Sequence, residues 1–265
     1  MIFANHAHLY PDELRENSGL DSLKQLMWDC GLDRVVAFAT FPFIFKRLGS
    51  DRDNNSWLYH KIKNEDSIVP FGTLDFTKTD LIQQVDHIAD LGFKGIKLHP
   101  AAQGFALLEE RALEVYARAQ EHDLFLSFHT GVHHSRLKDS QPILFDEIAY
   151  QFTDLRFSME HIGGYSFFKE ALAVMINNDR QGRQPRIFAG WTSIEDNNKT
   201  AWALTDEQLE TVIAQTGELN SIFGLDFPFK DADYINRAID RVKNLNISQE
   251  AKANILGGNL LRELS

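Results

Sequence analysis

Short apolar runs rich in β-branched and aromatic residues alternate with amphipathic runs from one end of the chain to the other. This order is typical of a parallel sheet built from strand–helix units, because each parallel connection needs a crossover. Eight is the number of parallel strands that closes a (β/α)8 (TIM) barrel. The pattern predicts strands at residues 2–9, 34–40, 68–75, 95–99, 124–129, 155–161, 186–191 and 221–226.

The amphipathic runs between these strands predict helices. In the first of them Leu23, Leu26 and Met27 fall on one stripe, and Gly31 is a plausible stop. A last helix over residues 248–264 starts with Ser248 as its N-cap, and we expect it to complete the outer ring of helices. The other helices are predicted at 80–92, 109–123, 143–152, 167–178, 205–217 and 231–242.

An open, doubly wound sheet gives the same alternation of strands and helices. Such a sheet usually carries a glycine-rich phosphate turn after its first strand, whereas this chain reads HAHLYPDEL there. No Pro-rich or Gly/Ser-rich linker divides the sequence. We therefore predict an α/β fold, a TIM barrel in which residues 1–265 form one domain.

The charge and composition of the chain narrow its partners. A net charge of -11 over 265 residues, without a Lys/Arg cluster, argues against nucleic acid and against an anionic membrane surface. The N-terminal residues do not resemble a secretory signal peptide, and no apolar run approaches the ~20 residues of a membrane-spanning helix. Cys30 is the one cysteine, so no disulfide can form within the chain. We expect a cytoplasmic protein that acts on a small molecule. The aromatic residues at 41–45 suit a homodimer contact and a lid over the site equally well.

Candidate chemistry is sought at the C-terminal ends of the strands, where TIM barrels carry their active sites. His6 and His8 end the first predicted strand, and alternate residues of a strand point to the same face. The ends of the other strands add polar residues in compact motifs, namely Lys97, His99, His129, His161 and Asp226.

Imidazole and carboxylate groups together suit a divalent cation such as zinc or manganese. Three or four such ligands with one open position make a catalytic site rather than a structural one. The bound ion would lower the pKa of a water from ~15.7 towards ~7 and so supply hydroxide at neutral pH. The residue types therefore predict a catalytic metal centre.

The motifs HAH, GIKLHP, FHTG, EHIGG, FGLDFP and NILGGNLLREL follow one another over nearly the whole chain. In this order they resemble the amidohydrolase superfamily, in the amidohydrolase-related (amidohydrolase 2) branch that includes aminocarboxymuconate-semialdehyde decarboxylase. The resemblance implies one divalent metal held by His6, His8, His129 and Asp226. Zinc is the expected metal and manganese the alternative. The resemblance also implies that His161 contacts the substrate or the activated water.

Four further residues are expected near the substrate. Some relatives carry a carbamylated lysine where Lys97 stands, but we expect Lys97 to be unmodified and to contact an anionic substrate group together with His99. Rim positions paired with carboxylates are the alternative for both residues. Arg136 suits a bidentate clamp on a carboxylate, although an exposed loop arginine is equally consistent with its position. Trp191 is expected near the mouth of the barrel, where relatives often have small polar residues.

The leading functional interpretation is a metal-dependent hydrolase that cleaves an ester, lactone or amide of a small, anionic or cyclic substrate. Asp226 would act as the base and then as the acid, and His161 would stabilise the oxyanion. One alternative is a metal-dependent decarboxylase of the same branch, which the motifs do not separate from a hydrolase. The other alternative is a non-catalytic barrel that binds a ligand.

Overall fold

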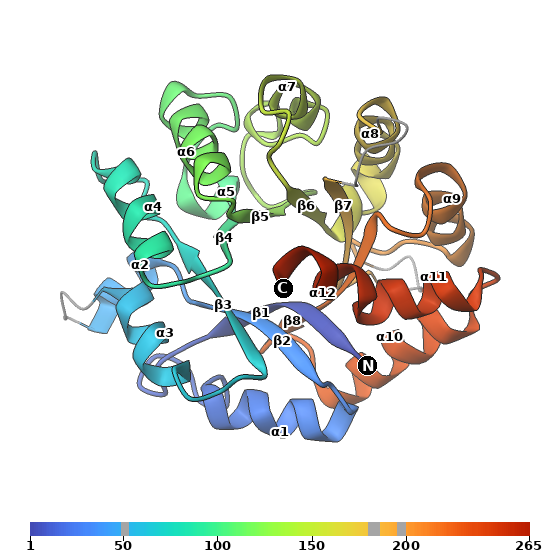
Figure 1. Cartoon of the computed structure of the whole chain (residues 1–265), viewed down its shortest axis with the longest axis horizontal. Coiled ribbons are helices and arrows are strands. Elements are labelled where there is room, and N and C mark those ends of the chain that lie inside the picture. The colour runs from blue at the N-terminus through green and yellow to red at the C-terminus, as the bar shows by residue number, and fades with distance from the viewer. Residues whose placement is uncertain (49–52, 180–185, 195–199) are drawn as a thin grey trace.

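Eight parallel strands close into a barrel in sequence order, with β1 paired to β8 (Figure 1). The computed structural model describes residues 1–48, 53–179, 186–194 and 200–265. The predicted TIM barrel is confirmed, and each strand lies within two residues of its expected bounds at either end. The strands are β1 Phe3–Leu9, β2 Arg34–Ala39, β3 Ile68–Thr73, β4 Gly95–Leu98, β5 Phe125–His129, β6 Phe157–Glu160, β7 Ile187–Thr192 and β8 Ser221–Phe227.

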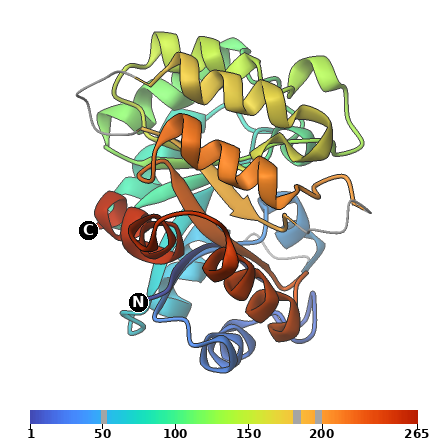
Figure 2. The same ribbon diagram turned by 90° about the vertical axis from the view of Figure 1, so that its right-hand side faces the viewer.

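The helices form a layer outside the sheet (Figures 1 and 2), because each buries an apolar stripe against the strands and leaves its polar face to solvent. The first predicted helix lies at 20–30 and ends at Gly31, which has the left-handed conformation of a C-cap. The helices are α1 Leu20–Cys30, α2 Pro42–Phe45, α3 Asn54–Ile62, α4 Leu81–Asp90, α5 Pro100–Gln103, α6 Glu110–Glu121, α7 Leu144–Gln151, α8 Gly164–Asn177, α9 Asp206–Thr216, α10 Ala232–Asn244, α11 Gln249–Ala253 and α12 Asn259–Leu264.

The segment after β2 contains helices that the sequence pattern did not predict. The Asp53 carboxylate accepts a hydrogen bond from the Ser56 backbone N–H at 2.6 Å and so caps α3. Phe45 is buried, and its ring lies 5.4 Å from that of Trp57. The aromatic residues of this segment therefore serve partly to pack it onto the barrel.

The last predicted helix is interrupted and does not simply join the outer ring. Residues 254–258 form a π-helical turn between α11 and α12. A Cβ on Gly257 would lie 2.7 Å from the Phe3 backbone nitrogen, so the chain passes very close to the start of β1. Leu260 and Leu264 of α12 then pack with Phe3 inside the barrel. This helix closes the N-terminal end of the barrel, where Figure 1 shows it over the strands.

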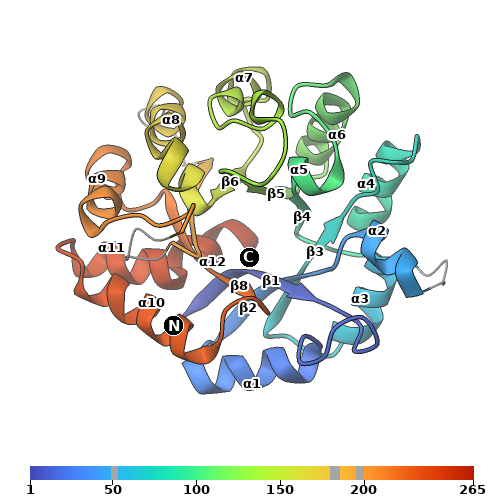
Figure 3. The same cartoon turned by 180° about the vertical axis from the view of Figure 1, so that it is seen from behind.

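The barrel interior is apolar near the N-terminal ends of the strands and polar near their C-terminal ends. Towards the N-terminal ends of the strands it is filled by an aromatic and aliphatic cluster, made of Phe3, Val36, Phe38, Val69, Phe71, Phe125, Phe188, Ile222, Leu260 and Leu264. Towards the opposite end, seen in Figure 3, the buried interior side chains are polar. No helix in the described ranges is long and apolar enough to cross a membrane.

Replacing Leu260 by alanine tests the closure by α12. We expect the free energy of unfolding to fall by about 2–5 kcal/mol, because the variant leaves a cavity against Phe3. Leu261 is only partly buried against the same cluster, so Leu261→Ala should cost less. Denaturant unfolding of both variants checks this, and equal losses would contradict the assigned packing.

Candidate metal centre

His6 and His8 both point into the barrel, as the alternation of β1 predicts. The pairing of β1 with β2 shifts register between Ala4 and Ala7, which marks a β-bulge. His6 lies at the bulge with a φ of 74°, a left-handed conformation that is uncommon outside glycine. Asn5 faces the interior too, where its amide reaches Glu160 of β6, so the bulge allows two consecutive residues to point inward. Three side chains of one strand therefore face the site.

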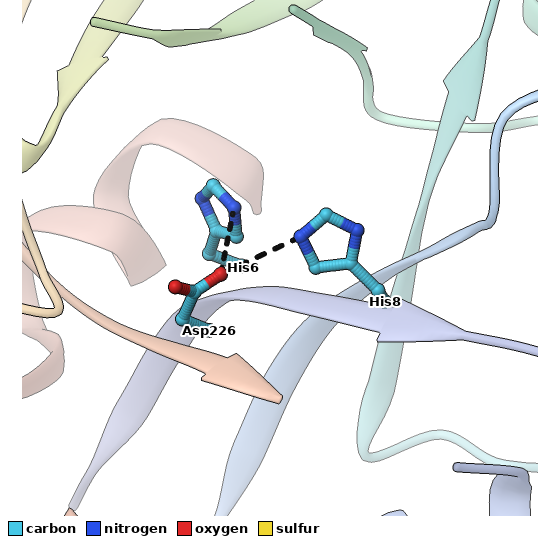
Figure 4. A group of neighbouring side chains, drawn as sticks. All are labelled: His6, His8 and Asp226. Atoms are coloured by element: carbon cyan, nitrogen blue, oxygen red, sulfur yellow. Dashed lines mark ion pairs between the residues drawn. The ribbon is translucent and has the colours of Figure 1, made fainter. Parts of the chain in front are cut away.

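Asp226 of β8 completes a compact group with the two histidines (Figure 4). Its Oδ1 lies 3.6 Å from Nε2 of His6 and 3.5 Å from Nε2 of His8. Ser193 donates a hydrogen bond to Oδ2 at 2.7 Å and so orients the carboxylate. One ligand atom from each of the three residues lies within 4.8 Å of the others.

This donor set fits a divalent cation. Burial, with the Lys97 charge as the second cause, lowers the pKa of His6 to about 3, and burial also lowers the pKa of His8. Both rings are therefore neutral near pH 7 and have a lone pair to offer. Burial alone would raise the pKa of Asp226, but its hydrogen bond to His8 and the other nearby imidazoles hold it well below the usual range. Two neutral imidazoles and one carboxylate are typical ligands of zinc and manganese.

His161 lies beside this group on the loop that follows β6. Its ring centroid is 5.8 Å from that of His6, and its backbone has a φ of 65°. Nδ1 donates to the Thr192 carbonyl oxygen at 2.7 Å, so the neutral ring has its lone pair on Nε2. Trp202 stacks on the ring at 5.2 Å. The orientation of the His161 ring beside the ligand group is thus fixed on two sides.

His129 is placed next to the compact group rather than within it. Its ring lies 4.8 Å from that of His161 and stacks on that of His99 at 3.8 Å. Its Nε2 is buried and has no hydrogen-bond partner in the part of the chain that the structure describes. Its assignment as a fourth metal ligand stays a prediction.

Lys97 is fully buried in the interior of the barrel and is not a rim residue. Its Nζ lies 5.9 Å from the centroid of the Phe38 ring and has no hydrogen-bond partner among the described residues. Burial lowers the pKa of Lys97 to about 8, against the opposing attraction of Glu160 and Asp226. The ammonium group therefore remains mostly protonated at pH 7. His99 is also buried, and its Nδ1 accepts a hydrogen bond from the Ala102 backbone at the start of α5.

Two residues expected near the substrate make other contacts. The Arg136 side chain is 71% exposed and is paired with Asp139 at 3.5 Å, which matches the alternative of a loop arginine. Trp191 is buried in the outer core, against Leu209 and Tyr234 of the helix layer. The physical reason is strand alternation, because its neighbours Gly190 and Thr192 face inward and contact the same buried side chain. The expectation that Trp191 stands at the mouth was wrong.

The side chain that Gly190 and Thr192 contact belongs to Glu160, which sequence reasoning missed. It is a completely buried carboxylate in β6, one residue before His161. Burial would raise its pKa, but the neighbouring His6 ring, the Lys97 charge and hydrogen bonds lower it to about 2. Its place at the end of a predicted strand, directly before the histidine of EHIGG, was the signal that could have identified it.

Comparisons with known proteins agree with the class that this geometry defines, a barrel with a candidate metal centre of histidine and carboxylate side chains at its strand ends. Residues 49–262 match the family model described as Amidohydrolase. The chain therefore belongs to the amidohydrolase family, within its amidohydrolase 2 branch. A search of curated protein sequences gives no match.

Solved structures share the fold at low sequence identity. An uncharacterised TIM-barrel protein from Bordetella bronchiseptica has 16% identity and a TM-score of 0.79, over 99% of this chain and 98% of that one. The 5-carboxyvanillate decarboxylase of Sphingomonas paucimobilis has 14% identity and a TM-score of 0.73, over 99% of this chain and 98% of that one. A dihydroxybenzoic acid decarboxylase from Polaromonas has 14% identity and a TM-score of 0.71, over 99% of this chain and 96% of that one. That structure contains manganese and the inhibitor 2-nitroresorcinol.

Elemental analysis of the untagged protein tests the metal centre. We expect about one divalent ion per chain, and its loss in the double variant His6→Ala/His8→Ala, because both imidazoles are removed. His60→Ala, which removes an exposed histidine outside the site, is the matched control and should keep the metal. An equal metal content in all three proteins would contradict the site.

Proposed function

We propose that this protein is a metal-dependent decarboxylase of a small aromatic carboxylic acid. The observation that carries the proposal is the buried ammonium group of Lys97, which lies beside the ligand group and has no hydrogen-bond partner among the described residues. A buried cation of this kind needs an anionic partner, and a substrate carboxylate supplies one. Two of the similar structures reported above are decarboxylases of aromatic acids, which is consistent with this assignment.

The charge balance of the interior supports a substrate with one negative charge. Among the described residues, Glu160 and Asp226 contribute two negative charges and Lys97 one positive charge. With a divalent cation the sum is +1, which a monoanion neutralises.

Aromatic rings lie against the histidines of the site. Phe38 lies 4.5 Å and Phe229 5.4 Å from the His8 ring, both edge-on. Phe41 lies 6.5 Å from the His8 ring and 6.1 Å from the His99 ring. Aromatic side chains in these positions suit an aromatic substrate, since aromatic groups gain from stacked and edge-to-face contacts.

His6, His8 and Asp226 would hold the cation, with His129 as the expected fourth ligand. The ion would stabilise negative charge on the substrate's oxygens, and zinc and manganese both suit the donors. In the reaction, the bond between the ring carbon and the carboxylate breaks, carbon dioxide leaves, and one proton takes its place on the carbon. We assign that transfer to Asp226, whose ionised carboxylate would first take a proton from solvent and then pass it to the ring carbon, which keeps the electron pair of the broken bond. His161 would position the substrate beside it.

Hydrolysis by activated water is the second candidate. The observation that favours it is the fixed tautomer of His161, whose Nε2 lone pair is free to accept a proton. Assaying lactones and aromatic carboxylic acids side by side separates the two, because only decarboxylation releases carbon dioxide.

Asp226→Asn tests the reaction. We expect turnover of hydroxylated benzoic acids, followed by release of carbon dioxide, to fall at least about 10³-fold, because proton transfer and a ligand charge are both lost. Asp240→Asn, which alters an exposed helix carboxylate, should retain activity. If the manganese-loaded or zinc-loaded protein released carbon dioxide from none of a panel of such acids, the decarboxylase assignment would fail.

Lys97→Met tests the carboxylate contact. The variant keeps most of the length of the side chain and removes the charge, so KM for the acid should rise about tenfold or more, with a smaller change in kcat. Lys94→Met changes an exposed lysine three residues away and serves as the control. An unchanged KM in Lys97→Met would remove this residue from the substrate site.

A further inference from the structure

The carboxylate of Glu160 is surrounded by donors from four strands. Oε1 accepts hydrogen bonds from Asn5 at 2.7 Å, Ser127 at 3.1 Å and Ser158 at 2.5 Å, and Oε2 accepts one from Thr192 at 2.5 Å. These donors are all neutral, so they stabilise the buried charge without cancelling it. The barrel holds a fixed negative charge at this point.

That charge faces the inner nitrogen of a metal-centre histidine. Oε2 of Glu160 lies 3.4 Å from Nδ1 of His6, while Nε2 of the same ring faces Asp226. An ionised carboxylate only accepts hydrogen bonds. Glu160 is the nearer of the two carboxylates, and Oδ1 of Asp226 is shared with Nε2 of His8 at 3.5 Å. A neutral His6 is therefore favoured with its proton on Nδ1, which leaves the lone pair on Nε2 where a metal ion would bind.

We propose that Glu160 is the positioning residue of the metal centre, which fixes the tautomer and orientation of His6 without binding the metal itself. The proposal rests on the proposed function only in taking His6 as a metal ligand. It explains why a carboxylate is kept inside the barrel, where burial of an ion costs several kcal/mol unless its environment compensates.

The neighbouring strands leave room for this arrangement. A Cβ on Gly190 of β7 would lie 2.5 Å from Oε2 of Glu160, so a side chain there would displace the carboxylate. The bulge in β1 lets the consecutive residues Asn5 and His6 both face the interior, where the Asn5 amide reaches Oε1. Both features therefore help to place the Glu160 side chain against His6.

Glu160→Gln is the decisive variant, because it keeps the shape and removes the charge. The amide group of Asn5 donates to Oε1, so the glutamine oxygen is favoured at that position and its NH2 group takes the place of Oε2. That NH2 group would donate towards His6, which favours a lone pair on Nδ1 and moves the ring proton to Nε2.

Two measurements follow. Imidazole ¹⁵N NMR of the metal-free protein should show the His6 proton on Nδ1 in the wild type and on Nε2 in Glu160→Gln. Competition binding of Mn²⁺ should show an affinity about 10–100-fold lower in the variant. Ser127→Ala is the matched control, since it removes one donor but keeps the charge, and it should change Mn²⁺ affinity less than about threefold and leave the tautomer unchanged.

The outcomes separate the two proposals. A His6 proton on Nε2 in the wild type overturns the role of Glu160 without any variant, and so does a folded Glu160→Gln protein that keeps both the wild-type tautomer and the wild-type affinity. If His6→Ala does not weaken Mn²⁺ binding, the assumed ligand role of His6 fails and the positioning role fails with it. If the tautomer and the Mn²⁺ affinity change as expected but no acid releases carbon dioxide, the role of Glu160 is supported. Only the decarboxylase proposal is then contradicted.

Discussion

The metal centre depends on backbone that breaks the alternation of its strands. A regular strand presents every second side chain to the barrel interior, which is too few to place all these groups at one level. His6, His161 and Asp226 adopt left-handed conformations, with φ of 74°, 65° and 61°. At the first two positions, consecutive residues face inward as the pairs Asn5–His6 and Glu160–His161. Such conformations cost about 1–3 kcal/mol each and persist where surrounding contacts determine them.

Those contacts are visible around each strained residue. The Nδ1 of His161 is held by the Thr192 carbonyl, and the Asp226 carboxylate by Ser193. His6 is held between two carboxylates, one at each ring nitrogen. The site is therefore organised by neighbouring strands before any ion or substrate arrives, which is the condition for rapid and selective binding.

The sequence predicted most of what regular patterns control. The strand positions, those of the helices between β3 and β8 except α5, and the shared face of His6 and His8 follow from periodicity. Asn5 and Glu160 could not be placed in the same way, because their roles depend on a bulge and on contacts between strands far apart in the sequence. Trp191 is a different case, since strict alternation from Gly190 already places it outward. The helix at 259–264 has an apolar face that suits the outer ring and the barrel end equally, so its position depends on the close approach at Gly257.

The metal centre also has a consequence for how the protein is made. Its compact group joins residues 6 and 8 to residue 226, so the ligands are separated by more than two hundred residues of chain. A growing polypeptide cannot assemble this group until β8 has left the ribosome, and Leu260 and Leu264 must follow before the opposite end of the barrel closes. Such long-range contacts slow folding, because the entropy of a large loop is lost before they form. Until Leu260 and Leu264 emerge, the apolar side chains of the earlier strands lack the elements that cover them, and exposed apolar surface of this kind promotes aggregation.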